Sequence, residues 1–520
     1  MKEQTLMVST LILTATSFFT RTIGMISIVF LSHILGAEGI GIYELTMSVY
    51  TTAVAFASAG LSVSVSKLVA EELGRRAPHN IAKIMRIAFT FALSLSFLIS
   101  ILLFIGAPYL AMHIIHDSHA SIGLRLLSIS IPFISCSSCF KGYFYATKKT
   151  VFPASADIIE QIVKMGLILT LVQLYSPLGL SYAYGAIGLG LTIGEMTSWS
   201  YLGSLFILDR RKYHQAHNKE NSIALESSTN LFIRLISILL PIASISYIAY
   251  VFMSIENILI PTGLKKFGNS FQESMGLYGM LKGMVLPILF FPSAFLTAFS
   301  TTLVPEIAKA NVLKRKERVI TTTNRVLQLT FILSILVVGI FVNYSNELGF
   351  AIYKNEAIGP MLCALSLVVP FIYIEVVTDG ILKGLGKQMS CLKYSMLDSI
   401  CRIILIYFLL PIKGMTAFMG IMMISCILTS TLNFNALLNT THIKFQLTNW
   451  LLKPSLAAAA GGTFSRLIIN RFFRYQFGLT TKVIIGISLT IIIYLVVLFI
   501  IECLSSEDLA WLKKHMPFLN

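Results

Sequence analysis

Apolar stretches of about 20 residues, separated by short polar segments, recur from one end of this 520-residue chain to the other. A helix of about 20 residues crosses a hydrocarbon core of roughly 30 Å, and it satisfies its own backbone hydrogen bonds in lipid. The pattern therefore predicts an all-α integral membrane protein with about fourteen transmembrane helices. We expect these spans at residues 6–32, 41–66, 86–108, 122–144, 152–175, 181–207, 230–255, 273–303, 326–345, 357–382, 391–411, 415–438, 450–469 and 483–503.

Composition excludes a water-soluble protein. Hydrophobic residues make up 56% of the chain and charged residues only 12%, whereas soluble domains carry roughly 25% charged residues. The formal net charge of +16 raises the question of nucleic-acid binding. However, basic stripes with interleaved aromatic residues are missing, and the cations lie between apolar spans. Membrane topology therefore explains the charge, and no nucleic-acid partner is expected.

The distribution of lysine and arginine predicts the orientation in the membrane. With the N-terminus in the cytoplasm, the inner loops hold 26 of the 40 lysine and arginine residues, and the outer loops hold 9. Cytoplasmic loops of membrane proteins carry an excess of these residues. We therefore expect both termini to be cytoplasmic and the number of spans to be even.

An internal repeat divides the chain into two halves. The second span begins with Gly-Ile-Tyr at 41–43, and the eighth begins with Gly-Leu-Tyr at 276–278, an offset of 235 residues. Val-Ala-Glu at 69–71 and Val-Pro-Glu at 304–306 keep the same offset. Both spans run in the same direction, and a parallel repeat predicts two lobes with a substrate site between them.

The repeat also predicts the domain organisation. Each lobe contains six spans, and an additional helix pair follows the second lobe. The expected divisions are a first lobe at 1–212, a cytoplasmic linker at 213–228, a second lobe at 229–440, the helix pair at 448–505 and a cytoplasmic tail at 506–520.

Three ionisable residues inside the spans are candidates for a binding site in the central cavity. Arg21 is near the middle of the first span, where an unpaired arginine costs about 2.5 to 3.5 kcal/mol on insertion scales. Glu256 in the seventh span follows at the repeat offset of 235 residues, so the two are placed to pair across the cavity. Lys282 lies about three turns into the eighth span. Cations in such a cavity suit an anionic headgroup such as a pyrophosphate.

Other charges inside the spans are candidates for ion coupling or gating. Asp157, Glu160 and Lys164 follow one another at i, i+3 and i+7, on one face of the fifth span. Glu160 is placed to pair with Lys164 one turn later. A structural salt bridge that joins neighbouring helices is the competing explanation for such pairs. The remaining candidates are Glu195 in the sixth span, Glu375 and Asp379 in the tenth, and Asp398 and Arg402 in the eleventh.

No motif indicates enzymatic or metal chemistry. His113, His116 and His119, with Asp117, form a run whose three-residue spacing brings two ligands to one helical face. An interfacial amphipathic helix is the favoured explanation, so no metal site is assigned and no cofactor is expected. The sequence contains no G-x-x-x-x-G-K-[ST], H-E-x-x-H or G-x-S-x-G pattern. An enzyme, whether ATPase or hydrolase, has no support.

Four stretches, at residues 18–44, 129–164, 277–310 and 371–387, resemble the stage V sporulation protein B family. That family belongs to the superfamily of MATE multidrug exporters, polysaccharide flippases and lipid II flippases. The resemblance covers most of the chain and implies a two-lobed bundle that alternates between inward-open and outward-open forms. For lipid II flippases it also implies a cationic cavity for the pyrophosphate-sugar headgroup and a helix pair whose groove holds the polyprenyl tail.

The resemblance extends to single residues. Arg21 matches the first-span arginine of the lipid II flippases, and Lys282 stands roughly where an eighth-span cation is expected. The second span lacks the arginine that lipid II flippases commonly carry there. With this resemblance, the expected location is the bacterial cytoplasmic membrane.

The expected function is a flippase that moves a polyprenyl-pyrophosphate-linked cell-wall precursor, for spore cortex peptidoglycan, from the inner to the outer leaflet. Its expected partners are this lipid-linked sugar, membrane lipids, a coupling ion (H⁺ or Na⁺) and cell-wall synthesis enzymes. One alternative is an ion-coupled multidrug exporter with Glu195, Glu256 and Glu375 as coupling carboxylates. The other is a membrane scaffold that recruits wall-synthesis enzymes without transporting anything.

Overall fold

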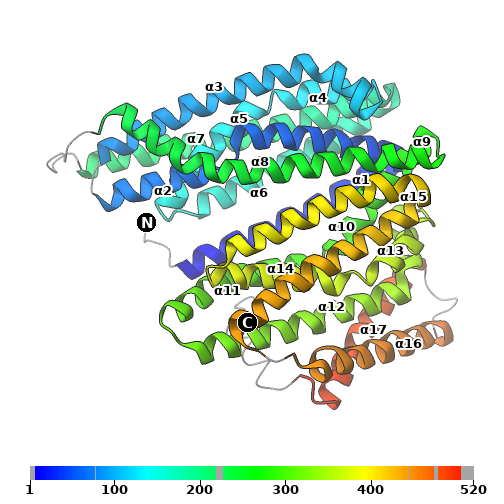
Figure 1. Cartoon of the computed structure of the whole chain (residues 1–520). Coiled ribbons are helices and arrows are strands. Elements are labelled where there is room, and N and C mark those ends of the chain that lie inside the picture. Colours follow the sequence, from blue (N-terminus) through cyan, green and yellow to red (C-terminus); the bar gives the residue numbers. More distant parts are fainter. Residues whose placement is uncertain (1–5, 76–77, 218–225, 444, 473–477, 505–520) are drawn as a thin grey trace. The chain divides into compact units, whose positions relative to one another are not determined.

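The computed structural model describes residues 6–75, 78–217, 226–443, 445–472 and 478–504, and within these ranges it contains helices and no strand (Figure 1). The expected tail at 506–520 and residues 218–225 of the expected linker lie outside the described residues. The all-helical fold predicted from the apolar pattern is confirmed.

The described helices form two compact units. Unit 1 comprises residues 1–262 and 270–279, and an apolar core lies between its helices α2, α3, α5, α6, α7 and α8. Its elements are α1 (Leu6–Ser58), α2 (Leu61–Gly74), α3 (Pro78–Leu110), η1 (Ala111–Ile115), α4 (Ala120–Ser128), α5 (Ile131–Ala146), α6 (Val151–Tyr175), η2 (Ser176–Leu178), α7 (Leu180–His217), α8 (Ser228–Phe267, as far as Thr262) and α9 (Phe271–Gly279).

Unit 2 comprises residues 263–269 and 280–520. One of its apolar clusters joins α12 to the final helix pair, α16 and α17. Its elements are η3 (Met280–Val285), α10 (Leu286–Phe290), α11 (Ser293–Val312), α12 (Lys316–Tyr353), α13 (Ile358–Ser366), α14 (Val369–Gly384), α15 (Gln388–Thr441), η4 (Thr448–Leu452), α16 (Lys453–Phe472) and α17 (Leu479–Ile500).

Each expected span coincides with a helix or with consecutive helices. By length and composition, seven helices of the described chain are able to cross a membrane, or nine if each of two bent pairs is one span. Two of the seven are far longer than a bilayer, with 63 residues at Ile12–Gly74 and 54 at Gln388–Thr441. At 1.5 Å per residue they measure about 95 and about 80 Å, so each accommodates two of the expected spans.

A glycine divides each of these long helices. Gly36 has φ 69° and ψ −178°, and Gly414 has φ 59° and ψ −143°. Residues with a Cβ atom rarely adopt such angles, because the side chain collides with the backbone. The chain therefore changes direction at Gly36 and Gly414, where the first span meets the second and the eleventh meets the twelfth.

Replacing Gly36 by alanine is expected to lower the free energy of unfolding by about 1 to 3 kcal/mol, because alanine is strained at these angles. The melting temperature of the purified protein in detergent measures the effect. Gly24 lies in the same helix, and no neighbouring atom lies within 4 Å of its Cβ position. Gly24→Ala is therefore the matched control and should leave the melting temperature unchanged or raise it. An equal fall in melting temperature in both variants would show that the loss does not come from the backbone angles of Gly36.

Unit 1 includes two helices of the second sequence repeat. Asn257 on α8 donates a hydrogen bond from Nδ2 to Ser48 Oγ on α1 at 3.0 Å. Nearer the start of α8, the ring of Tyr247 stacks on Phe56, with 4.7 Å between centroids. These contacts hold α8 against the second half of α1. The compact units thus differ in extent from the lobes at 1–212 and 229–440, which rest on the sequence repeat and stay a prediction.

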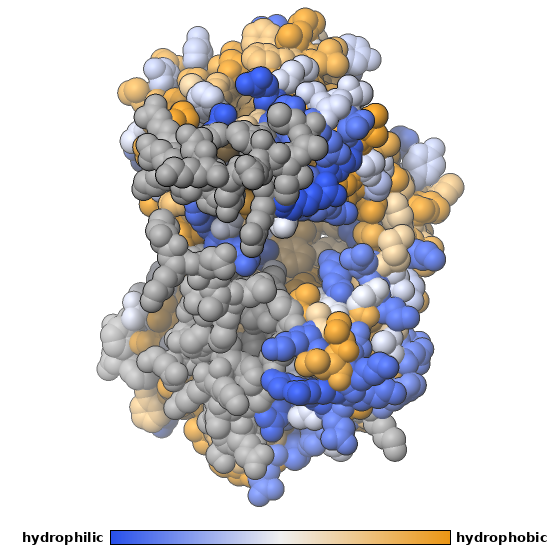
Figure 2. All heavy atoms as spheres, turned by 90° about the vertical axis from the view of Figure 1, so that its left-hand side faces the viewer, coloured by the Kyte–Doolittle hydropathy of each residue, from blue (hydrophilic) through white to orange (hydrophobic). Residues whose placement is uncertain are grey.

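Polar residues gather at the helix ends. Figure 2 views the side of the molecule that is on the left in Figure 1, and hydrophilic residues are numerous on this face. Exposed cations near the α2–α3 end of unit 1 include Arg86, and those near the α11–α12 end of unit 2 include Lys309, Arg315 and Arg318. Apolar residues cover the flanks in the same view. This separation is the one that a bilayer requires of a spanning protein.

Candidate functional site

The approach of α7 to α6 sets up a buried charged site in unit 1. Gly190 and Gly194 stand one turn apart on α7 and face α6. A Cβ atom on Gly194 would lie 3.0 Å from the Cβ of Lys164, and one on Gly190 would lie 2.7 Å from Cγ1 of Ile168. Small residues let helices pack this closely in membranes. Glu195, next to Gly194, is thereby brought to the charged face of α6.

The charges on this face form a cluster. Lys164 Nζ lies 2.9 Å from Glu160 Oε1 and 3.6 Å from Glu195 Oε1. The side chains of these three residues are only 13 to 17% exposed. One turn away on α6, Asp157 Oδ1 lies 2.7 Å from Nζ of Lys141 on α5. We call these five residues the α6 charge cluster.

The α6 charge cluster joins three helices and carries one more carboxylate than ammonium group. The Glu160–Lys164 pair predicted from sequence is formed, and the structure adds Glu195 and Lys141 to it. A carboxylate without its own cation in a low-dielectric site favours the uptake of a proton or a monovalent cation. The arrangement is therefore chemically suited to ion coupling.

Unit 2 has a smaller polar site on α15. Asp398 pairs with Arg402 one turn later, and Ser425 donates a hydrogen bond to Asp398 Oδ1 at 2.5 Å. Asp398 and Ser425 lie on opposite sides of the break at Gly414. The hydrogen bond therefore joins two consecutive expected spans.

The carboxylates of α14 lie beside this site but pair differently from those of unit 1. Glu375 interacts electrostatically with Asp398 and Arg402. Asp379 Oδ2 accepts from Lys383 Nζ at 2.6 Å within the same helix. In unit 1, by contrast, Lys141 on α5 pairs with Asp157 on the neighbouring helix α6. One lysine pair therefore lies within a single helix, and the other joins two helices.

A second ionic network in unit 1 was missed by sequence reasoning. Arg234 on α8 contacts three carboxylates, with Nη2 2.7 Å from Glu71 and Nη1 3.0 Å from Glu72 and 2.5 Å from Glu226. The side chain of Glu72 is 1% exposed and also accepts from Asn80 Nδ2 at 2.9 Å. This network ties α8 to α2 and α3. In the sequence, the only sign of this network is the pair of adjacent acidic residues, Glu71 and Glu72, where the repeated segment 69–71 ends.

The three expected headgroup residues have different surroundings. The side chain of Arg21, on the first half of α1, is exposed, and no residue in the described ranges forms an ion pair or hydrogen bond with it. Glu256 on α8 is buried and takes part in other interactions, so the expected Arg21–Glu256 pair is not formed. Lys282 belongs to unit 2, where it lies in the π-helical turn η3. Such turns inside α-helices are frequent at functional sites.

Gly41, at the start of the repeated segment, and Gly279 mark a close backbone contact in unit 1. A Cβ atom on Gly41 of α1 would collide with the carbonyl oxygen of Met275 on α9, and one on Gly279 would collide with that of Ala37. Only residues without side chains allow two backbones to approach in this way. No atom lies within 4 Å of the Cβ position of Gly276, which is the repeat partner of Gly41. The starts of the second and eighth expected spans thus lie against each other.

The histidines of the expected outer loop do not converge on one point. His113 stacks on Tyr109, with 4.3 Å between ring centroids, and His119 Nδ1 lies 2.5 Å from Ser181 Oγ. His116 packs edge-on against Phe271. Within the described residues, no group of three or more histidine, cysteine, aspartate or glutamate residues is able to hold a metal ion.

Long apolar helices broken at glycines, with charged clusters inside the helix bundle, define a multi-pass membrane protein. The chain belongs to the polysaccharide biosynthesis protein family, whose model matches residues 6–311. Stage V sporulation protein B of Bacillus subtilis (strain 168) is 22% identical over 522 residues, which cover 100% of this chain and 99% of that relative. The resemblance found in the sequence is therefore confirmed.

Two further comparisons concern flippases. Lipid II flippase MurJ of Bacillus subtilis (strain 168) is 21% identical over 402 residues, which cover 73% of this chain and 72% of the relative. Among solved structures, a lipid II flippase MurJ in an inward closed conformation matches with a TM-score of 0.70 and 16% identity. That match covers 94% of this chain and 99% of the solved one. The chain therefore has the lipid II flippase fold, and these relatives are not enzymes.

Proposed function

We propose that this protein moves a polyprenyl-pyrophosphate-linked cell-wall precursor across the bacterial cytoplasmic membrane, with both termini in the cytoplasm. The observation that carries the proposal is Arg21, an exposed cation in mid-span without a partner in the described ranges. Lys141, Lys164 and Arg234 in the same unit all have carboxylate partners. An unpaired arginine is costly in a span, so an anionic ligand is the natural counter-charge.

The headgroup and the tail have separate sites in this proposal. Arg21 binds the diphosphate, and Lys282 and Glu256 are the further candidates for binding the headgroup. The tail lies in lipid along the outer faces of α16 and α17, where Leu456, Phe464 and Ile484 are 57 to 68% exposed. The polysaccharide biosynthesis family and the full-length relative, a stage V sporulation protein, support this substrate class. The particular precursor in the proposal is one for spore cortex peptidoglycan.

Alternating access supplies the movement in the proposal. The diphosphate binds Arg21 more tightly in one conformation than in the other, and this differential affinity shifts the conformational equilibrium. The candidates for coupling to H⁺ or Na⁺ and for gating are the α6 charge cluster in unit 1 and Glu375, Asp379, Asp398 and Arg402 in unit 2. The excess carboxylate of the α6 charge cluster supports coupling to a cation. Cell-wall synthesis enzymes are the proposed partners downstream.

Arg21→Ala is expected to lower translocation by at least about 30-fold, because truncating one partner of a desolvated charge pair costs about 2 kcal/mol or more. Translocation of a defined polyprenyl-pyrophosphate sugar into proteoliposomes measures it, with and without an ion gradient. Arg21→Lys keeps the charge and should retain part of the activity. The control is Arg86→Ala, which removes another exposed cation from unit 1. Wild-type transport by Arg21→Ala would refute the role.

An ion-coupled exporter of cationic drugs is the second candidate, since the excess carboxylate of the α6 charge cluster also suits a drug/ion antiporter. The two candidates make opposite predictions for Arg21, because a cation in the cavity repels a cationic drug. Drug accumulation in cells that express the protein separates them. Export that rises in Arg21→Ala would favour the exporter.

A further inference from the structure

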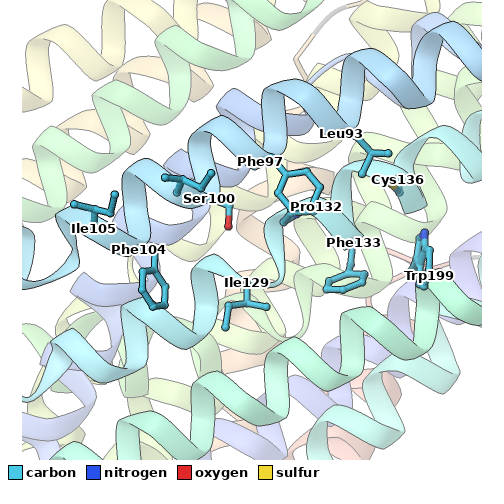
Figure 3. Close-up of a pocket in the computed structure, with 11 residues that line it drawn as sticks. Leu93, Phe97, Ser100, Phe104, Ile105, Ile129, Pro132, Phe133, Cys136 and Trp199 are labelled. Carbon is cyan, nitrogen blue, oxygen red and sulfur yellow. The ribbon is translucent and has the colours of Figure 1, made fainter.

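An apolar groove of about 560 Å³ lies on the surface of unit 1, between α3, the break from α4 to α5, and α7 (Figure 3). We call it the α3 groove. Its floor is buried, with Ser100 9% and Cys136 4% exposed. Its rim is open, with Phe97 and Ile101 each 53% and Ile105 72% exposed. A buried floor with an open rim makes this a concave site. Its lining is apolar and includes none of the residues proposed for the headgroup.

The groove forms where a transmembrane helix is broken. The pair α4 and α5 bends by 40° at residues 129–130, so it does not follow α3 as a straight helix would. Ser100 donates to the carbonyl of Ser128 at 2.7 Å, and Thr192 donates to the carbonyl of Leu126 at 2.8 Å. The backbone is therefore satisfied from within the protein. The surface left to the groove is apolar and suits a hydrocarbon chain.

The length of the groove matches one leaflet. Its lining on α3 runs from Leu93 to Ile105, which is about 18 Å at 1.5 Å per residue. Half of a hydrocarbon core of roughly 30 Å is about 15 Å. A chain that fills one leaflet therefore fits the groove from end to end, whereas a polyprenyl chain is much longer.

A cation stands at one end of the groove. The guanidinium of Arg125 on α4 lies over the ring of Phe104, 5.6 Å from its centroid, and Phe104 lines the groove next to Ile105. Arg125 is exposed, and no carboxylate in the described part of the chain forms an ion pair with it. An unpaired arginine at the end of an apolar groove favours a phosphate over a neutral headgroup.

We propose that the α3 groove is a binding site for an anionic phospholipid, with one acyl chain between Phe104 and Trp199 and the headgroup phosphate on Arg125. The occupant follows from the complementarity of shape and charge: an apolar channel of one leaflet's length that ends at an unpaired cation. Such a lipid would brace the break between α4 and α5 by filling the space that the bend leaves.

Photocrosslinking of the full-length protein in nanodiscs tests the site. The probes are phosphatidylglycerol and phosphatidylcholine that carry the same photoreactive acyl chain, in a phosphatidylcholine background. Phosphatidylglycerol is expected to label peptides of α3 and α5 that line the groove, and to label them more than phosphatidylcholine does. Arg125→Gln should reduce this preference about fivefold, and Arg125→Lys should keep most of it.

Two tryptophan variants distinguish labelling by a lipid bound in the groove from labelling by bulk lipid. Ile101→Trp places an indole in the groove and should abolish labelling of its lining. Leu98→Trp is the matched control, because Leu98 is 56% exposed on the same helix but does not line the groove, and its labelling should remain as in the native protein. Both variants alter exposed positions, so the fold is expected to survive.

Four results would overturn the proposal. Equal labelling by both probes, or labelling spread evenly over all lipid-facing helices, would mean bulk lipid only. Equal losses in Ile101→Trp and Leu98→Trp would place the labelling outside the groove. Displacement of the probe by a polyprenyl phosphate but not by unlabelled phosphatidylglycerol would assign the groove to the isoprenoid chain. None of these results bears on Arg21, so the headgroup role proposed for this residue stands or fails separately.

Discussion

Replacing Gly41 by leucine is expected to abolish transport while the protein still folds. The Cβ position of Gly41 overlaps the carbonyl oxygen of Met275 on α9, which is backbone and does not yield as a flexible side chain does. Overpacking of this kind costs about 1 to 3 kcal/mol, which shifts a two-state equilibrium roughly 5- to 150-fold. In alternating access the expected outer ends of the second and eighth spans must close in each cycle. The variant should therefore accumulate the form in which they are apart.

Two measurements check this expectation. Translocation in proteoliposomes should fall, and a cysteine at Met275, which is 1% exposed in the native contact, should become reactive toward a membrane-impermeant maleimide. The native cysteines are replaced beforehand. Gly276→Leu is the matched control, because this repeat partner has open space at its Cβ position. If both leucine variants lose transport equally, or if Gly41→Leu transports normally, the contact is not a gate.

The helices could be predicted from sequence because an apolar segment of about 20 residues in lipid satisfies all of its backbone hydrogen bonds within itself only as a helix. The expected first and second spans were placed on either side of residues 33–40, and the structure instead continues helical through them apart from the break at Gly36. The positive φ at Gly36 is the conformation of a single residue and depends on how the helices around it pack. A hydropathy average over many residues therefore does not predict where such a break falls.

The candidate site could be predicted only where it depends on a single helix. The Glu160–Lys164 pair follows from the pitch of α6, so the i, i+4 spacing was sufficient. The approach of Glu195 depends on Gly190 and Gly194 turning one face of α7 toward α6. The three carboxylates on Arg234 depend likewise on how α8 packs against α2. Contacts between helices distant in sequence require the packing, which neither spacing nor composition supplies.

Replacing Lys164 by methionine is expected to lower the free energy of unfolding by about 3 to 5 kcal/mol, because it leaves two buried carboxylates without their shared cation. Glu160 and Glu195 both contact Lys164 Nζ, and all three side chains are at most 17% exposed. The melting temperature in detergent should fall accordingly. Adding Glu160→Gln and Glu195→Gln to Lys164→Met removes the unpaired charges and should restore most of the stability.

Lys383→Met provides the contrast, since its pair with Asp379 has the same i, i+4 spacing but side chains 49 and 33% exposed. Exposed pairs contribute only about 0 to 1 kcal/mol, so this variant should melt close to the native protein. The restored triple variant then separates structure from coupling. Because it folds but has lost the excess carboxylate, its translocation should no longer respond to an ion gradient. A triple variant that transports with full gradient dependence would show that the α6 charge cluster only joins helices.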